Sequence, residues 1–384
     1  MTGVVWDGAS VFLGSLIGVA SAAQLAAALS DGRRGGRRAT DVALILLSTS
    51  GAVLVVAAAD LVLLFVGLVL LTVPRYAMPD RGRGHLANDR AVGRFLVGAT
   101  STATVAYGVA LLYAAIGQTE YAGLGRATHN PLYLAGLALV CAGLVAPTVH
   151  AAGHRWATAS AVATAGALLR FAAATRNGDA ALDWEVTFAV LGAVALTATA
   201  LAALAERRLG RLVAYAAILQ LGYVAIGAAA FAAPAAGVAL AVYVAVALGL
   251  LGVVSMLPGD DPTLSDLAGL ARRRPLLVAA VGVLVLGAIG VPPAAGFIGR
   301  LTVFEAAVRA QLLWLVVAGA FATVLGAVSY GRIVLACFAP PRLDTVALPR
   351  ARTATLIVLL AALAVLVGGF VPGPLLEAAQ AVRF

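Results

Sequence analysis

The stretch PLLVAAVGVLVLGAIGVPPAAGFIGRLTVFEAAVR, residues 275–309, decides the fold. It is too long for one simple membrane crossing, which takes about 20 apolar residues. Pro292, Pro293 and Gly296 interrupt it. Because a proline lacks the backbone donor and clashes with the preceding turn, the pattern predicts a broken helix. Such a break is tolerated within a bilayer only where protein or water satisfies the freed backbone groups.

The rest of the chain repeats apolar runs of membrane-spanning length. Hydrophobic residues make up 62% of the 384 residues and charged residues 11%, whereas a soluble domain has about 25% charged residues. We therefore predict an all-α, polytopic integral membrane protein of about twelve transmembrane helices, forming a single membrane domain over residues 1–384. The expected spans are 9–30, 39–57, 59–78, 91–116, 131–149, 156–176, 183–205, 211–233, 235–256, 275–309 (broken), 311–338 and 353–371.

Charge alternates between successive loops. All 26 basic residues are arginines, and most of them gather in every second connection. The clusters lie at 33–38, 81–90, 207–211, 272–274 and 342–352. In the loop at 177–183 the only charged residues are the acids Asp179 and Asp183. The positive-inside rule then predicts a multi-pass protein with both termini outside. We expect it in a bacterial-type cytoplasmic (inner) membrane.

Several classes of function lack support. The net charge of +9 reflects loop arginines, so we expect no nucleic-acid partner. Cys141 and Cys337 lie far apart in apolar runs without metal-type spacing, and no nucleotide, haem, flavin or iron–sulfur pattern is present. We expect no cofactor and no metal on this chain.

Two stretches are specific enough to indicate a family, namely ERRLGRLVAYAAILQLGYVAIG at 206–227 and the run from LAGLARRRP at 267 to FEAAV ending at 308. A weaker match is LFVGLVLLTVPRYAM at 64–78, followed by RFLVGATSTATVAYGVALLYAAIG at 94–117. In order and spacing these resemble the antiporter-like membrane subunits of NADH:quinone oxidoreductase (respiratory complex I), and among them the N type. The resemblance covers nearly the whole chain and implies that it starts at the family's third helix. It also implies other membrane subunits as partners and no redox centre.

That family implies proton translocation along charged groups at mid-membrane depth. In that family a glutamate pairs with a lysine, and a second lysine lies at the centre. A last lysine or glutamate opens the half-channel through which the proton leaves. A buried lysine suits this task because its pKa is tunable. In this sequence the four positions fall on Val69, Val145, Ala161 and Arg300. Three are apolar and the fourth cannot release its proton. The family's first discontinuous helix also lacks its signature, so a plain helix is expected there.

The sequence allows two interpretations of the Arg300 side chain. Glu305 lies five residues later, close to the spacing of one helical face, so the two can form a residual buried ion pair that fixes the helix break. Alternatively both side chains reach interfacial water. Arg170 lies deep in an apolar run, and snorkelling to the interface is favoured over a buried functional charge.

The other candidates for a proton path or buried charge carry weaker signals. His150 and His154 are four residues apart near a segment end, which fits ordinary interfacial histidines, a proton antenna or, least well, a metal site without a third ligand. Tyr215 and Tyr223, with Gln220 between them, favour hydrogen-bonded helix packing over a water wire.

The sequence thus predicts a membrane subunit of a proton-translocating NADH:quinone oxidoreductase whose own relay is degraded, so that it acts mainly as a scaffold or coupling element. It would be an enzyme only as part of that translocase. Two alternatives stay open: a subunit of a cation/proton antiporter or membrane-bound hydrogenase, and a structural or assembly partner that moves no ions.

Overall fold

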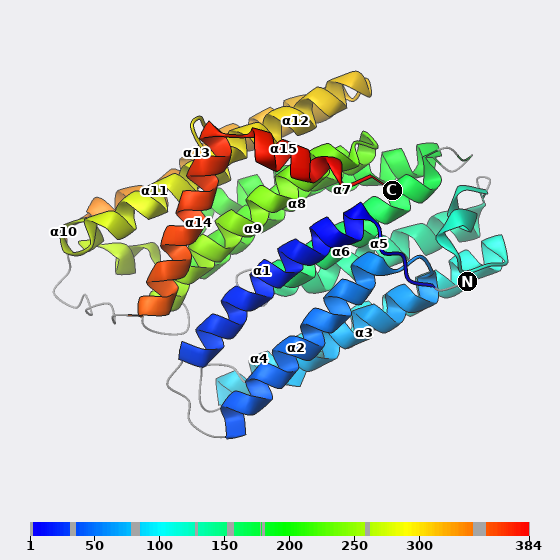
Figure 1. Cartoon of the computed structure of the whole chain (residues 1–384), viewed down its shortest axis with the longest axis horizontal. Helices are drawn as coiled ribbons and strands as arrows, with labels where there is room; N and C mark the ends of the chain where they lie inside the picture. The colour runs from blue at the N-terminus through cyan, green and yellow to red at the C-terminus, as the bar shows by residue number, and fades with distance from the viewer. Residues whose placement is uncertain are drawn as a thin grey trace. The chain divides into compact units, whose positions relative to one another are not determined.

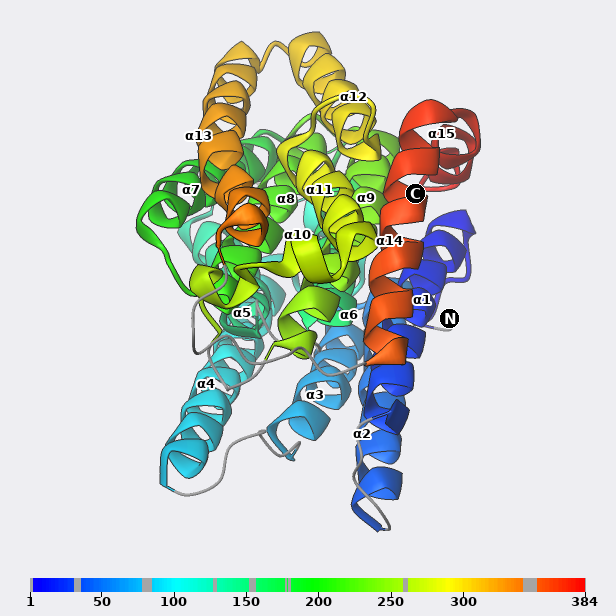
Figure 2. The ribbon, with the colours of Figure 1, turned by 90° about the vertical axis from the view of Figure 1, so that its left-hand side faces the viewer.

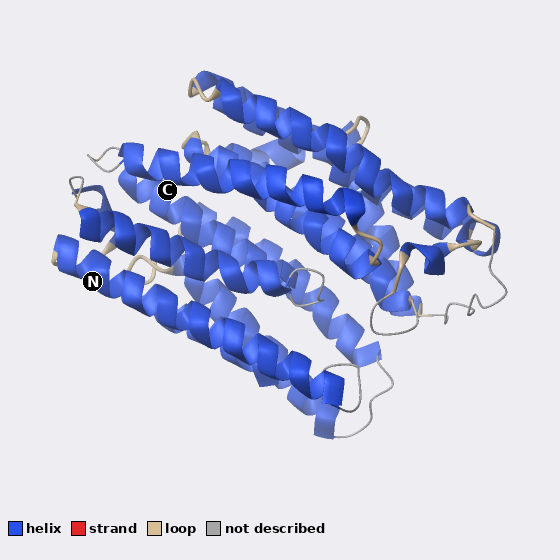
Figure 3. Cartoon of the chain, turned by 180° about the vertical axis from the view of Figure 1, so that it is seen from behind, coloured by secondary structure: helices blue, strands red, loops and turns tan. Residues whose placement is uncertain are grey.

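The computed structural model describes residues 3–30, 36–77, 85–126, 130–151, 157–176, 178, 181–257, 262–340 and 351–383. Within these residues the chain forms helices and loops, and the extended backbone is limited to isolated bridges. Figure 3 shows this helical content. Nine helices of the described chain are long and apolar enough to cross a membrane, and three shorter apolar helices lie at Leu61–Ala77, Pro131–Ala146 and Pro275–Ile289. The expected all-α, polytopic class is confirmed.

The residues group into two compact units. Unit 1 takes in residues 1–151, 156–188 and 381–384, and unit 2 takes in 152–155 and 189–380. Each is described by itself below, and one continuous membrane domain stays a prediction.

Unit 1 is a bundle built on three neighbouring pairs of helices. α1 packs on α2, α2 on α3 and α4 on α5, and Figure 1 shows α1, α2 and α3 as adjacent blue rods. α6 packs against both α1 and α2 and is almost wholly buried. The elements are α1 (Gly8–Ser30), α2 (Gly36–Ala57), α3 (Leu61–Ala77), α4 (His85–Ile116), η1 (Tyr121–Arg126), α5 (Pro131–Ala151) and α6 (Ala157–Thr175).

Close backbone approach explains why glycines recur inside these helices. A Cβ on Gly51 of α2 would lie 2.3 Å from the backbone nitrogen of Leu71 in α3. Small residues give helices in a bilayer their van der Waals contact, since lipid is as apolar as the side chains it would replace. α5 is a single uninterrupted helix, as expected from the missing signature of a discontinuous one.

Unit 2 is centred on α9, which contacts α8, α11, α12 and α14. α7 begins in unit 1 and ends in unit 2. The elements are α7 (Ala181–Ala205), α8 (Leu209–Ala229), α9 (Ala233–Met256), η2 (Leu264–Leu267), α10 (Leu270–Arg273), α11 (Pro275–Ile289), α12 (Ala295–Arg309), α13 (Leu313–Phe338), α14 (Arg352–Phe370) and α15 (Gly373–Gln380). Figure 2 shows the yellow α11 and α12 separated by a break, with the orange α13 following α12.

Candidate functional site

The helix break is set by the glycine and prolines that follow α11. Gly290 has a left-handed backbone (φ +77°) and ends α11, donating its N–H to the Leu286 carbonyl at 2.8 Å. Glycine is the residue that tolerates this conformation at a helix C-terminus. Pro292 and Pro293 cannot continue the helix, and α12 starts at Ala295. The expected discontinuous helix is therefore present, with its gap at 290–294.

Arg300 folds back from α12 onto the open end of α11. Its guanidinium donates to the carbonyl oxygens of Ile289 and Ala288, the latter at 2.5 Å, and to the hydroxyl of Thr323 in α13 at 2.9 Å. The side chain is only 4% exposed. The last carbonyls of a helix have no partner within it and carry the negative end of the helix dipole. Arg300 therefore caps α11 with a fixed positive charge.

Tyr223 of α8 also contacts the Arg300 guanidinium, through the face of its ring. The guanidinium carbon of Arg300 lies 4.5 Å from the centre of the Tyr223 ring, within cation–π range. The Tyr223 hydroxyl lies 2.9 Å from both the Gly319 carbonyl and the Thr323 hydroxyl. We define Arg300, Tyr223, Thr323 and the carbonyls of Ala288 and Ile289 as the Arg300 cluster. The groups that face the positive charge of Arg300 in this cluster are carbonyl and hydroxyl dipoles and the face of an aromatic ring.

The expected pairing of Arg300 with Glu305 is wrong. Glu305 lies 2.5 Å from Arg309, one turn further along α12, and both side chains are more than half exposed. No ion pair of Arg300 occurs among the described residues. Five residues turn an α-helix by about 140° beyond a full turn, so Glu305 faces away from the break. Glu305 is thus an exposed, locally paired acid.

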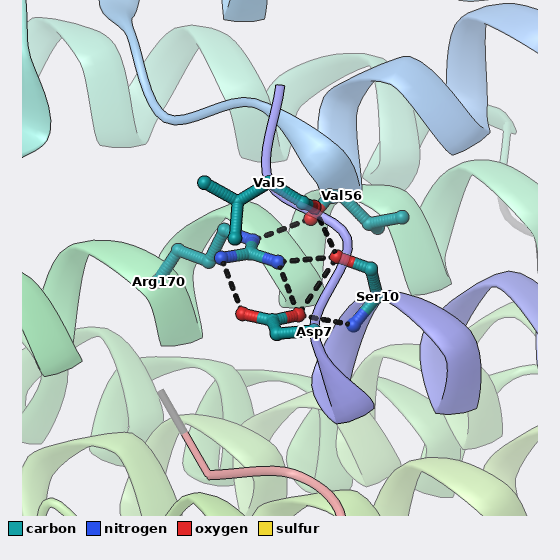
Figure 4. Close-up of polar contacts among 5 residues, drawn as sticks. All are labelled: Val5, Asp7, Ser10, Val56 and Arg170. Carbon is teal, nitrogen blue, oxygen red and sulfur yellow. Dashed lines mark hydrogen bonds and ion pairs between the residues drawn. The ribbon is translucent and has the colours of Figure 1, made fainter. Parts of the chain in front are cut away.

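Arg170 of α6 does not snorkel to the surface, because it is 7% exposed and binds an acid inside unit 1. Its terminal nitrogens lie 2.8 and 3.1 Å from the carboxylate oxygens of Asp7, and one donates to the Ser10 hydroxyl at 2.5 Å. Its Nε donates to the Val56 carbonyl near the end of α2. Figure 4 shows these contacts converging on one guanidinium. In the sequence, Arg170 is noticeable because it lies deep in an apolar run, whereas no local pattern indicates Asp7 as its partner.

Asp7 lies before the first span and is 26% exposed. Burial raises the pKa of its carboxyl, but hydrogen bonds from Arg170 and Ser10 outweigh this, so the net pKa lies below the ordinary value. The pair is therefore ionised at neutral pH.

The remaining predicted residues contribute less. Tyr215 is half-buried in α8, and no described hydrogen bond joins its hydroxyl to the Arg300 cluster. His150 lies in α5, but its side chain and the whole of His154 are outside the described residues. Gln220 lies 3.5 Å from the carbonyls of Gly287 and Ala288, a weak contact with the end of α11.

At the other relay positions the side chains are apolar. Ala161 is fully buried in α6, while Val69 and Val145 are half-buried. Near Ala161 the polar groups are hydroxyls: Thr164 lies 3.0 Å from Thr148 of α5 and donates to the Leu144 carbonyl. Hydroxyls of this kind do not ionise at physiological pH. Within the described ranges, no three metal-binding side chains come together.

Two further arginines repeat the contact that Arg300 makes. Arg332 of α13 donates to the carbonyls of Ala203 and Glu206 at the end of α7, at 2.6 and 3.0 Å. Arg38 donates to the Leu29 carbonyl at the end of α1. With Arg170 at the end of α2, a guanidinium meets four helix C-termini within the residues that the structure describes. Composition alone did not indicate this use of arginine.

Comparison with known proteins gives one consistent result. A family model described as NADH:quinone oxidoreductase/Mrp antiporter, transmembrane, matches residues 58–326. NADH-quinone oxidoreductase subunit N 2 of Roseiflexus castenholzii is 33% identical over 91% of this chain and 78% of its own length. A chain of respiratory complex I from Thermus thermophilus with bound aureothin superposes with a TM-score of 0.85 and 30% identity, over 99% of this chain and 88% of that one. A chain of the Mrp complex from Dietzia shares the fold at a TM-score of 0.79 and 20% identity, over 99% and 84% of the two chains.

Proposed function

Since this chain belongs to the NADH:quinone oxidoreductase/Mrp antiporter membrane family, as an antiporter-like subunit of the N type, we propose that it acts mainly as a scaffold and coupling element of a complex I-type membrane arm. Its own proton relay is degraded. Other membrane subunits and the lipid bilayer surround it, and it carries no redox centre.

The observation that carries this proposal is the set of partners of Arg300. A relay group must load and release a proton, which lysine does when burial lowers its pKa. Arginine stays protonated at physiological pH. Here the guanidinium is also committed to two α11 carbonyls and to Thr323. The residue is therefore suited to hold the helix break in one shape.

The apolar positions upstream support the same conclusion. A buried charge without its partner is costly, about 3–5 kcal/mol when one member of a buried pair is removed. A module that abandons conduction should thus lose both members of an ion pair together. Val69 and Val145 fit this pattern, and Ala161 removes the central group.

The test measures protons translocated per electron by the purified complex in proteoliposomes. We expect fewer protons than from the same complex carrying an N-type relative with its glutamate and lysines intact. We also expect Arg300→Lys and Arg300→Met to leave the ratio unchanged, because the chain carries no relay to interrupt. Arg332→Met is the matched control, since it removes another guanidinium from helix-end carbonyls in unit 2.

A full proton ratio in the unmodified complex would contradict the proposal. So would a ratio that falls in Arg300→Met but not in Arg332→Met. If Arg300→Met fails to assemble, the ratio of the unmodified complex against the complex that carries the intact N-type relative decides the question.

The family also includes Mrp antiporters, and the Dietzia chain shares the fold, so a cation/proton antiporter subunit is the second candidate. Purification in mild detergent separates the two. Co-purifying NADH- and quinone-binding subunits support the respiratory assembly, whereas small antiporter subunits support the second candidate. For either assembly we propose a bacterial-type cytoplasmic membrane with both termini outside.

A further inference from the structure

Three connecting segments of unit 1 are joined by backbone hydrogen bonds at the end of the bundle where α1 begins. Residues 3–5 pair with 57–59, and residues 59–61 pair with 119–121. The four bonds run from Val5 N to Ala57 O (2.8 Å), Ala59 N to Gly3 O (3.0 Å), Leu61 N to Thr119 O (2.9 Å) and Tyr121 N to Ala59 O (3.0 Å). We define these segments as the cover of unit 1.

An aromatic stack begins in the cover, at Tyr121. The rings of Tyr121 and Phe171 are 4.9 Å apart, and those of Phe171 and Trp184 are 5.5 Å apart, with Phe188 beyond. All four side chains are buried. Trp184 donates its indole N–H to the Tyr133 hydroxyl at 2.6 Å, which fixes the stack to α5. Close-packed rings leave little room for water.

Arg170 connects the cover with this stack. It precedes Phe171 in α6 and holds Asp7 and Ser10 at the start of α1 together with the end of α2. A buried charge that loses its partner is strongly destabilising, so removal of either charge should release the start of α1. Other side-chain hydrogen bonds of the cover in the described residues run from Thr119 to Asp60 and from Ser10 to the Val5 carbonyl.

We propose that the Asp7–Arg170 ion pair is a clasp that closes this end of unit 1 to water and small ions. The clasp fastens the first residues of α1 and the end of α2 to α6, and so keeps the cover seated beside the aromatic stack. The inference does not depend on Arg300, which belongs to unit 2. In a membrane subunit without a working relay, such closure prevents a passive leak.

The two native cysteines supply the test, because each unit contains one. Cys141 of α5 is 1% exposed in unit 1 and lies eight residues after Tyr133, on the same face of the helix. Cys337 of α13 is fully buried in unit 2. Cys141 should therefore report on water that passes the stack and the Tyr133 hydroxyl that anchors it, whereas Cys337 reports on unit 2 alone.

The experiment follows reaction of both thiols with a small, permanently charged methanethiosulfonate reagent in the intact complex in mild detergent. We expect Arg170→Leu and Asp7→Ala to speed the labelling of Cys141 by at least about tenfold and to leave Cys337 unchanged, as local opening requires. Arg38→Leu is the matched control, since it removes an exposed guanidinium from a helix end of the same unit. It should leave both thiols protected.

The two thiols also distinguish local opening from loss of the fold. Fast labelling of both cysteines means that the variant has unfolded, and Arg170→Lys then replaces it, because it keeps the charge but loses the fork that binds Asp7. Cys141 that stays protected in folded Arg170 and Asp7 variants overturns the proposal. So does equal exposure of Cys141 in Arg38→Leu.

Discussion

Substitution of Gly296 by alanine tests whether the broken helix depends on direct backbone contact between its two halves. A Cβ built on Gly296 would lie 1.9 Å from the carbonyl oxygen of Gly287 in α11, where real contacts stay above 3.0 Å. The two helices must therefore separate by about 1.1 Å. Such a shift is enough to carry the 2.5 Å contact of Arg300 with the Ala288 carbonyl beyond hydrogen-bonding range.

The expected loss follows from two opposing effects. Alanine stabilises a helix by about 0.5–1 kcal/mol relative to glycine, because the unfolded chain loses freedom. Overpacking of a close contact costs about 1–3 kcal/mol, and a weakened hydrogen bond to a charged group adds about 1.5–3 kcal/mol. Gly296→Ala should therefore lower the free energy of unfolding by about 1.5–5.5 kcal/mol in all.

The assay is unfolding of the purified complex in detergent, with Gly282→Ala as the internal reference. Gly282 lies in α11, and a Cβ there meets nothing within 4 Å. This control should be neutral or slightly stabilising. Equal stability of the two alanine variants would refute the reasoning, because it would mean that α11 and α12 do not touch at Gly296.

Three further predictions concern other contacts. Tyr223→Phe keeps the ring beside Arg300 but loses the hydroxyl bonds to Gly319 and Thr323, so thermal unfolding should show a loss of about 1 kcal/mol. Tyr133→Phe leaves the buried Trp184 N–H without its acceptor and should cost about 1–3 kcal/mol, part of which Tyr133→Phe with Trp184→Phe recovers. The pKa of Asp7 is lowered in the folded protein, so its stabilising effect is complete above the ordinary carboxyl pKa of 3.8 and is lost as the pH falls through the folded pKa. An acid titration of stability should show this loss, and Asp7→Asn should abolish it.

The sequence predicted the elements of the fold better than the contacts between them. Hydropathy and length located the spans, and Gly290 with the two prolines located the break, because these signals are local. The partner of Arg300 was mispredicted because the arginine side chain points back toward the start of α12, away from Glu305. Asp7 and Arg170 are separated by 163 residues, and no periodic pattern indicates such a pair.

Guanidinium contacts at four helix ends bear on how this chain can change over time. An ammonium is a point charge and cannot bind two carbonyls in the planar geometry of the guanidinium fork. At Arg300, where two guanidinium nitrogens bind two different carbonyls, a substitution by lysine therefore leaves the end of α11 less completely capped. The architecture itself thus opposes the exchange of this arginine for a side chain that can release its proton.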